Sequence, residues 1–255
     1  FSSELVQNGN FSELGSELIV NGDFATDSNW SKGTGWSIGN GKASSAGGNE
    51  DAYLSQAILT VGKTYKVTFD VVDYTSGSLS VRVVNDSQAL GVNAIGSYTV
   101  YVVPSASTAI GFRSAGGAAG FVGSIDNVSV KQVDPNDRWT LVDIKFTGAN
   151  TFENTATNGR IFQSFTTIVG SKYKVSVTIN SGTWNVYAST NNNTSGQIAS
   201  TGNTTTSEFF EFTATATTSF LALYNIGASG SVASITNISV VEVQGDRPRL
   251  SYDIT

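Results

Sequence analysis

The chain contains 255 residues and carries a formal net charge of −6, and only 13% of its residues are charged. It has no run of Lys and Arg to contact phosphates, and no apolar stretch approaches the roughly 20 residues that span a bilayer. We therefore predict neither a nucleic-acid partner nor membrane insertion. Cys and His are both absent, which excludes disulfides and thiolate or imidazole metal ligands and leaves oxygen-bound Ca²⁺ as the first candidate metal.

The N-terminal residues contain a short repeat. ELVQNGNF at 4–11 is nearly repeated as ELIVNGDF at 17–24, and the second copy is followed directly by a longer module. We predict that residues 1–16 form an N-terminal segment, a partial repeat or linker strand. Three alternatives stay open for it: a remnant of duplication, the end of a preceding module, or a strand that pairs within the chain or with a neighbouring subunit.

The first module is predicted to span residues 17–133 and to consist of β-strands. Its clearest strand places Tyr65, Val67, Phe69 and Val71 on one face, with polar residues between them. Further alternating stretches follow at intervals of about ten residues with turn residues between them, a pattern typical of an antiparallel sandwich.

The second half of the chain repeats the first. LSQAILTVGKTYKVTFDV at 54–71 is similar to IFQSFTTIVGSKYKVSVTI at 161–179, and GSIDNVSVKQV at 123–133 is similar to ASITNISVVEV at 233–243. Two blocks in the same order indicate two copies of one module. We predict an all-β chain of two tandem antiparallel jelly-roll β-sandwich modules.

The remaining boundaries follow from this repeat. Pro135 and its polar neighbours predict a linker at 134–138. The second module then spans 139–244, with LVDIKF at 141–146 in the place of LIVNGDF in the first module. The tail at 245–255 is predicted to be a linker or the start of a further domain.

The strings NGDF at 21–24, GTGWSI at 33–38 and IDNVSV at 125–130 together resemble the carbohydrate-binding-module superfamily with a galactose-binding-like jelly roll. The tandem arrangement is similar to repeats of bacteriophage tail-fibre and other virion proteins. DRPRLSYDIT at 246–255 is similar to the junction that such proteins have before a lectin-like domain. The resemblance implies the fold, but the fold hosts glycan binding, trimeric scaffolding and plain spacing.

The resemblance also implies a structural Ca²⁺ between the first and last strands of the first module. The implied ligands are Asp23, the carbonyls near Gly41 and Lys42, and Asp126, as part of a shell of about six to eight oxygens. The alternative is that these carboxylates hydrogen-bond nearby backbone amides. In the second module Lys145 and Thr236 stand at the aligned acidic positions, so we predict no calcium there.

Aromatic side chains are the candidates for sugar binding, because glycan-binding modules stack an exposed ring on a pyranose. The candidates are Trp30, Trp36, Tyr53 and Tyr74 in the first module and Trp184 and Tyr187 in the second. Trp36 shares a face with Ile38, and Trp184 shares one with Val186, so we expect both Trp side chains in the core. Trp30 lies in a polar loop and is the strongest exposed candidate; its alternatives are packing under its own turn or in a subunit contact.

Hydrolysis of a glycan would need two carboxylates facing one cleft. The sequence offers Asp70 with Asp73, Glu208 with Glu211, and the acidic stretch at 49–51. All are more simply explained as solubilising residues on outer faces, so we predict that the chain is not an enzyme.

We therefore predict a non-catalytic structural and adhesive protein, a section of a phage virion fibre or tail protein, located in the virion or outside the cell. Its expected partners are cell-surface or extracellular glycans and other fibre subunits, and the resemblance implies homo-oligomers such as trimers. Repeated weak sites on a multimer would bind by avidity. The alternatives are an extracellular bacterial array of glycan-binding modules attached to a polysaccharide-active enzyme, and a spacer without a ligand.

Overall fold

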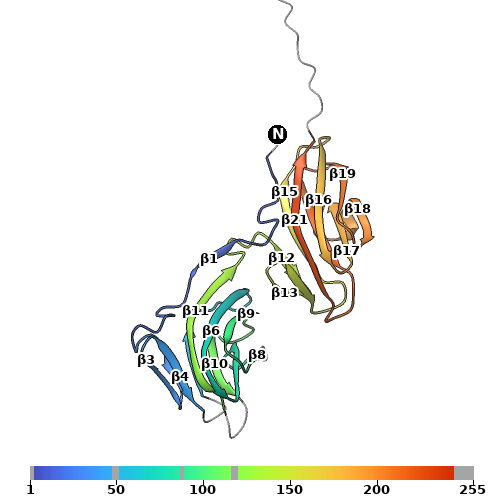
Figure 1. Cartoon of the computed structure of the whole chain (residues 1–255). Helices are drawn as coiled ribbons and strands as arrows, with labels where there is room; N and C mark the ends of the chain where they lie inside the picture. The colour runs from blue at the N-terminus through green and yellow to red at the C-terminus, as the bar shows by residue number, and fades with distance from the viewer. Residues whose placement is uncertain (1–2, 48–51, 87–88, 116–119, 244–255) are drawn as a thin grey trace, which may run out of the picture. The chain divides into compact units, whose positions relative to one another are not determined.

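The computed structural model describes residues 3–47, 52–86, 89–115 and 120–243. The chain divides into two compact units (Figure 1). The first sandwich is Glu13–Pro135, and the second sandwich combines the residues before it, up to Ser12, with those from Asn136 onward. The predicted tail at 245–255 lies outside the described residues.

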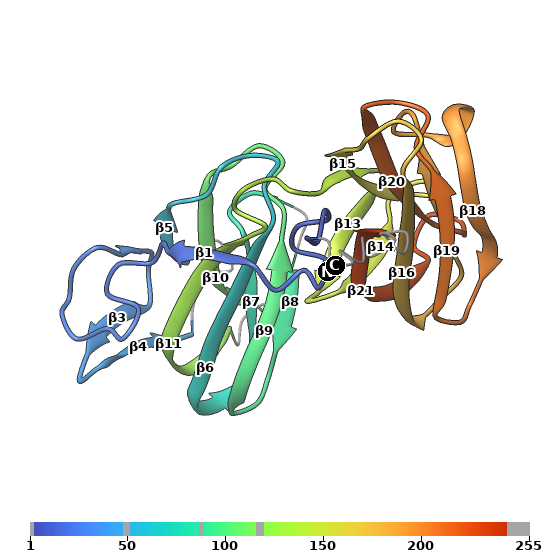
Figure 2. The same ribbon diagram turned by 90° about the horizontal axis from the view of Figure 1, so that it is seen from above.

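The first sandwich is built from antiparallel sheets. One has the strand order β3 (Trp36–Gly39), β4 (Lys42–Ala46), β11 (Val122–Val133), β6 (Tyr65–Ser76) and β9 (Gly96–Val102), and β1 (Leu14–Glu17) pairs with the last part of β11. The other has the order β2 (Ser31–Lys32), β5 (Tyr53–Ala57), β10 (Ala109–Ala115), β7 (Ser78–Val83) and β8 (Ala89–Val92). Figure 2 shows β11, β6 and β9 side by side.

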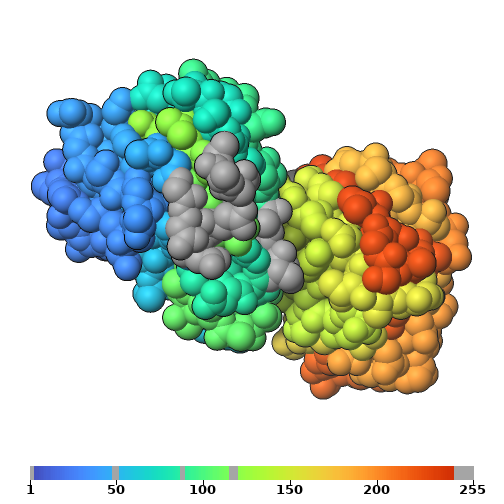
Figure 3. Space-filling model, turned by 90° about the horizontal axis from the view of Figure 1, so that it is seen from below, coloured from blue at the N-terminus to red at the C-terminus, as the bar shows by residue number. Residues whose placement is uncertain are grey.

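The second sandwich repeats this arrangement. One sheet has the order β13 (Ile144–Gly148), β14 (Thr151–Asn154), β21 (Val232–Glu242), β16 (Lys172–Ser181) and β19 (Glu208–Thr213). The other has the order β12 (Thr140–Val142), β15 (Arg160–Thr166), β20 (Thr218–Asn225), β17 (Trp184–Ser189) and β18 (Gln197–Thr204), and a short 3₁₀ turn, η2 (Thr194–Gly196), precedes β18. In the space-filling view, yellow-green residues of β13 and β14 adjoin orange-red residues from the last part of the chain (Figure 3).

The strand order defines a jelly roll. When β4 to β11 are counted in chain order, one sheet takes the first, eighth, third and sixth strands, and the other takes the second, seventh, fourth and fifth. The same order holds for β14 to β21. Two interlocked Greek keys produce this pattern. The predicted fold class, an all-β chain with two antiparallel jelly-roll sandwiches, is confirmed.

The core of each sandwich comes from the alternation that the sequence shows. On β6, Tyr65, Val67, Phe69 and Val71 are each at most 1% exposed. Full burial of such side chains stabilises the fold by about 1.5–3 kcal/mol each. The intervening polar residues of β6 face outward, as expected for a strand with one face on the core.

Residues 3–12 belong to the second sandwich, which differs from the predicted boundary at residue 16. We call residues 4–11 and 17–24 the opening segments of the second and first sandwich. Phe11 is buried there against Trp139, Phe146 and Phe152, with ring centroids 5.3, 5.8 and 5.0 Å away. The first sandwich is therefore inserted between the opening segment of the second sandwich and the rest of it.

This arrangement corrects the alignment of the two modules. LVDIKF at 141–146 forms β12 and β13 and does not replace the opening strand, because ELVQNGNF at 4–11 already occupies that position. Lys145 therefore is not the counterpart of Asp23; it pairs with Glu153 on the neighbouring strand at 3.1 Å. The residue at the position of Asp23 is Asn10.

Candidate functional site

Trp30, the strongest candidate from the sequence, is buried. Its side chain is 7% exposed and lies 5.2 Å from the ring of Phe24, and its indole N–H donates to the carbonyl of Asn21 at 2.9 Å. The prediction of an exposed sugar platform there does not match the structure. Trp139 is its counterpart in the second sandwich, donating to the carbonyl of Asn8 at 3.1 Å, so this Trp holds an opening segment in both modules.

The other predicted aromatic residues have mixed positions. Trp36 and Trp184 are buried, as expected. Tyr74 is half-buried, its hydroxyl donates to the carbonyl of Gly77, and its ring packs near that of Phe121. Tyr53 is half-buried on the outer face of β5.

The implied calcium ligands are engaged in local interactions. Asp23 accepts the backbone N–H of Ala25 at 3.3 Å, and Asp126 accepts that of Asn127 at 2.7 Å. Gly41 lies in the turn between β3 and β4, and Lys42 forms an ion pair with Asp73. Within the described residues, no group of three or more acidic, His or Cys side chains could hold a metal ion. The calcium site stays a prediction.

The role of Asp23 is clarified by its counterpart. Asn10 accepts the backbone N–H of Ser12 at 3.3 Å, as Asp23 does for Ala25. A neutral amide therefore makes the same turn contact as the carboxylate, and this contact does not need a charge.

The carboxylates considered for catalysis are held in different ways. Asp70 accepts hydrogen bonds from Ser97 and Asn127, which lower its pKa, and the Lys42 ammonium lowers the pKa of Asp73. A general acid in a glycosidase needs a raised pKa, so neither carboxylate suits that role. The stretch at 49–51 lies outside the described residues.

The remaining pair lies on β19 in the second sandwich. Glu208 accepts from the hydroxyls of Thr204 and Thr206, and Glu211 stands opposite Lys174 in the ladder. Strand alternation places Glu208 and Glu211 on opposite faces of β19, so they do not face one cleft. The chain's non-catalytic character stays a prediction.

A cluster of aromatic side chains lies on the outer face of the sheet that contains β15, β20 and β17. We call it the aromatic face; its members, all half-buried, are Phe162, Tyr187, Phe220 and Tyr224. Tyr187 and Tyr224 meet edge to face with centroids 5.4 Å apart, and Phe162 lies 6.4 Å from Phe220. Burial, with a smaller effect of Tyr224, raises the pKa of Tyr187. The sequence had singled out Tyr187, and its three aromatic neighbours come from other strands.

Polar groups complete this surface. Arg160, Tyr224 and Asn185 lie in register across β15, β20 and β17, and the Arg160 guanidinium lies over the Tyr224 ring, 5.6 Å from its centroid. Asn185 is 8% exposed, and its side-chain amide donates to Asn203 at 3.0 Å. Arg160 Nε and Asn185 Oδ1 are buried atoms without a hydrogen-bond partner in the described part of the chain.

Both atoms are buried and out of reach of a surface ligand, but the Arg160 side chain as a whole is only half-buried. The guanidinium carries several N–H donors, and a ligand hydroxyl can accept from them. The combination of ring faces with a guanidinium suits a ligand that has apolar C–H faces and many hydroxyls.

The first sandwich carries a reduced version of this surface. Arg113 and Tyr53 face each other across β10 and β5, as Tyr224 and Arg160 do across β20 and β15. The Arg and Tyr positions are thus exchanged between the modules. The positions of Phe162 and Phe220 are held in the first sandwich by Ser55 and Ala109, so the aromatic face is a property of the second sandwich.

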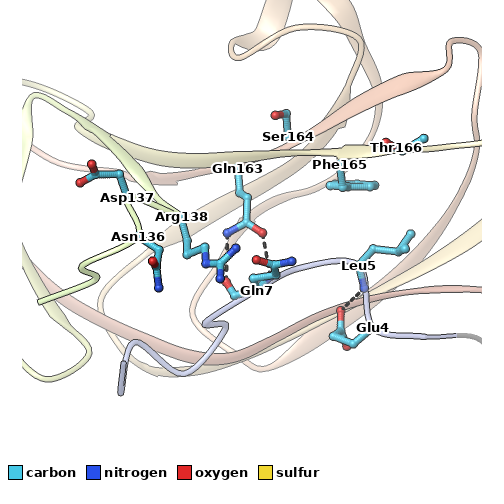
Figure 4. Close-up of a pocket in the computed structure, with 10 residues that line it drawn as sticks. All are labelled: Glu4, Leu5, Gln7, Asn136, Asp137, Arg138, Gln163, Ser164, Phe165 and Thr166. Atoms are coloured by element: carbon cyan, nitrogen blue, oxygen red, sulfur yellow. Dashed lines mark hydrogen bonds between the residues drawn. The ribbon is translucent and has the colours of Figure 1, made fainter. Parts of the chain in front are cut away.

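Two other features of the second sandwich have the exposure that a binding site needs. A cavity of about 510 Å³ lies beside the opening segment (Figure 4). Two of its polar side chains bond the opening segment itself, because the side chain of Gln163 bonds both backbone groups of Gln7 and the Glu4 carboxylate accepts the Leu5 N–H. Phe209, 66% exposed on β19, carries the Lys174 ammonium 4.5 Å from its ring centroid, but it is a single ring.

Comparison with known proteins does not place the chain in a family. No family model and no curated protein match it. Similar solved structures include the N-terminal CBM22-1-CBM22-2 tandem domain of Paenibacillus barcinonensis Xyn10C, with 12% identity and a TM-score of 0.34 over 92% of this chain and 100% of that chain. A Paenibacillus xanthan lyase has 13% identity and a TM-score of 0.29 over 95% of this chain and 26% of its own. Allantoicase has 11% identity and a TM-score of 0.29 over 95% of this chain and 93% of that chain.

The strand order and register define the class, a tandem jelly-roll β-sandwich protein. The described residues contain no helix with the length and apolar character to cross a membrane.

Proposed function

We propose that this chain is a non-catalytic glycan-binding protein and that the aromatic face of the second sandwich is its principal contact with sugar. The observation that carries the proposal is the set of Tyr187, Tyr224 and Arg160, in which the two rings meet edge to face and the guanidinium lies over one of them. The C–H groups of a pyranose ring pack on aromatic faces, whose π-electrons attract their partial positive charge. Ring hydroxyls would accept hydrogen bonds from the Arg160 guanidinium.

Retention on a glycan array tests this proposal. Tyr187→Ala is expected to weaken binding of a retained glycan about tenfold, which corresponds to about 1.4 kcal/mol. Phe209→Ala is the matched control, because it removes an exposed aromatic ring from the other sheet of the same sandwich. Equal binding by Tyr187→Ala and the wild type, or an equal loss in both variants, would contradict the assignment of the site. A chain retained on no glycan supports the spacer alternative.

We further propose that these modules belong to a fibre or tail protein of a virion and act there through avidity. The support is the resemblance of the tandem repeats together with two similar sandwiches in one chain. Linked weak sites gain affinity because the second contact forms at high effective concentration. Stable oligomers in light scattering support the fibre; a monomer favours the bacterial module array.

We also propose a structural calcium ion at Asp23 and Asp126 in the first sandwich. An unchanged melting temperature on addition of calcium or chelator would contradict it.

A further inference from the structure

The opening segment of the second sandwich is joined to it by contacts and not by neighbouring chain. Ser12 continues directly into Glu13, where the first sandwich begins, and the second sandwich resumes at Asn136. The 123 residues of the first sandwich, 13–135, therefore separate the segment from the rest of its own sandwich along the chain. The segment is remote in sequence, while the pairing of Leu14 with Val133 keeps its last residue near the point where the second sandwich resumes.

The site that receives this segment is specific. The Glu4 carboxylate accepts the N–H of Val240 at 2.7 Å and the hydroxyl of Ser239 at 2.5 Å, and Leu5 N–H donates to the Val240 carbonyl at 3.0 Å. Hydrogen bonds to a carboxylate are about twice as strong as neutral ones. Ile238 N–H donates to the Gly9 carbonyl at 2.9 Å.

The first sandwich binds its own opening segment in the same way. The equivalent bonds join Glu17 to Val130 and Ser129, Leu18 to Val130, and Gly22 to Val128. There the segment runs on into the body of its own sandwich, ending six residues before Trp30. The two sites thus make the same contacts, but the segment is continuous with its sandwich in the first and separated from it along the chain in the second.

We propose that the site for the opening segment on the second sandwich is also an assembly site, filled by residues 4–11 of a second copy of this chain. The contacts are the same whether the segment comes from its own chain or from another, so exchange costs mainly the entropy of association. Exchange would couple the first sandwich of one copy to the second sandwich of the next. Reciprocal exchange closes a dimer, and one-way exchange extends an open chain.

The absence of Cys from the sequence allows a direct test by cross-linking. Gln7 and Ser164 are both exposed and line the same cavity, and Gln7 binds Gln163 through its backbone, which Gln7→Cys retains. Full-length chains with Gln7→Cys and with Ser164→Cys are mixed, incubated and treated with a short bismaleimide. A covalent dimer containing one copy of each variant is the expected product.

The matched control uses the first sandwich. Val20→Cys and Ala57→Cys stand at the equivalent positions, since Gln56 bonds the backbone of Val20 as Gln163 bonds that of Gln7. Chains carrying both cysteines of either pair should cross-link internally, which establishes that the reagent spans the gap. Under those conditions, the Gln7→Cys and Ser164→Cys mixture should give several-fold more dimer than the Val20→Cys and Ala57→Cys mixture. Equal dimer in the two mixtures would overturn the proposal, and this outcome is independent of glycan binding.

Discussion

Each opening segment contains an Asn-Gly pair, and both residues are required by the local geometry. A Cβ atom on Gly9 would lie 2.0 Å from the carbonyl oxygen of Ile238, and one on Gly22 would lie 2.1 Å from that of Val128. Any side chain would push the segment away from the last strand of its sandwich, β21 for Gly9 and β11 for Gly22, which we call the closing strands. Asn8 and Asn21 precede them with φ angles of 52° and 59°, a conformation that Asn tolerates better than most residues.

Gly9→Ala should therefore destabilise the second sandwich, and Gly22→Ala the first, by about 2–3 kcal/mol each. Gly39→Ala is the control, because a Cβ there meets nothing within 4 Å. Denaturant unfolding followed in each sandwich measures the change. Wild-type stability in Gly9→Ala would show that the close approach to Ile238 relaxes at little cost.

Asp70 gives the first sandwich a dependence on pH. The hydroxyl of Ser97 donates to it at 2.5 Å and the amide of Asn127 at 2.8 Å, and both bonds lower its pKa. A lowered folded-state pKa stabilises the fold above the unfolded pKa of about 4, and this contribution is lost as the pH falls through the folded value. Asp70→Asn should remove it, so the melting temperatures of variant and wild type should converge as the pH falls below about 4. A constant difference across this range would contradict the role of Asp70.

At the scale of elements, two short motifs far apart in the sequence form one structural unit. The opening segment supplies Glu, Gly and Phe, and the closing strand supplies the Ser and the backbone groups that bind the Glu. Asn127 on β11 and Asn237 on β21 have φ angles of 53° and 49°, and the strand ladder with β6 or β16 shifts register beside each. This irregularity is a β-bulge in each closing strand, and the carbonyl of the segment's Gly accepts the N–H that follows the bulge.

Phe11→Ala is expected to destabilise the second sandwich by about 3–5 kcal/mol, because a fully buried aromatic ring is lost. Hydrogen exchange should increase in β15, β20 and β21 and stay unchanged in β6 and β11. Phe24→Ala, which is equally buried, should give the reverse pattern. Increased hydrogen exchange in β6 and β11 of the Phe11→Ala variant would show that Phe11 stabilises the first sandwich instead of the second.

For the whole molecule, the connectivity is an insertion of one jelly roll into another. Because Glu13–Pro135 is a compact unit and residues 3–12 contact the second sandwich, the chain order can be rearranged while the contacts within each unit are kept. A chain that runs 13–135, a short Gly-Ser linker, 3–12 and 136–243 should fold into the same two sandwiches. Two thermal transitions close to those of the wild type are expected. Loss of the second-sandwich transition would show that the insertion itself is required.

Much of the fold could be predicted from the sequence, since the strands with one buried face alternate clearly, as Tyr173 and Val175 do on β16. The position of Trp30 could not, because a Trp in a polar loop is compatible with either exposure or packing. The aromatic face was missed for a different reason. Phe162, Phe220 and Tyr224 come from strands distant in sequence, and outward-facing aromatic residues look like core residues until the register is known.

The sequence by itself determined the repeat, the all-β class and the core faces, because these depend on local alternation and on turn residues. It also contained two opening segments for two modules, both before residue 25. Only the tertiary structure decided which module each segment completes, because a partner more than a hundred residues away is chosen by hydrogen bonds and buried rings and not by proximity in the chain. In the same way, the cross-strand register decided that the candidate sugar-binding surface lies on the second sandwich and not on the first.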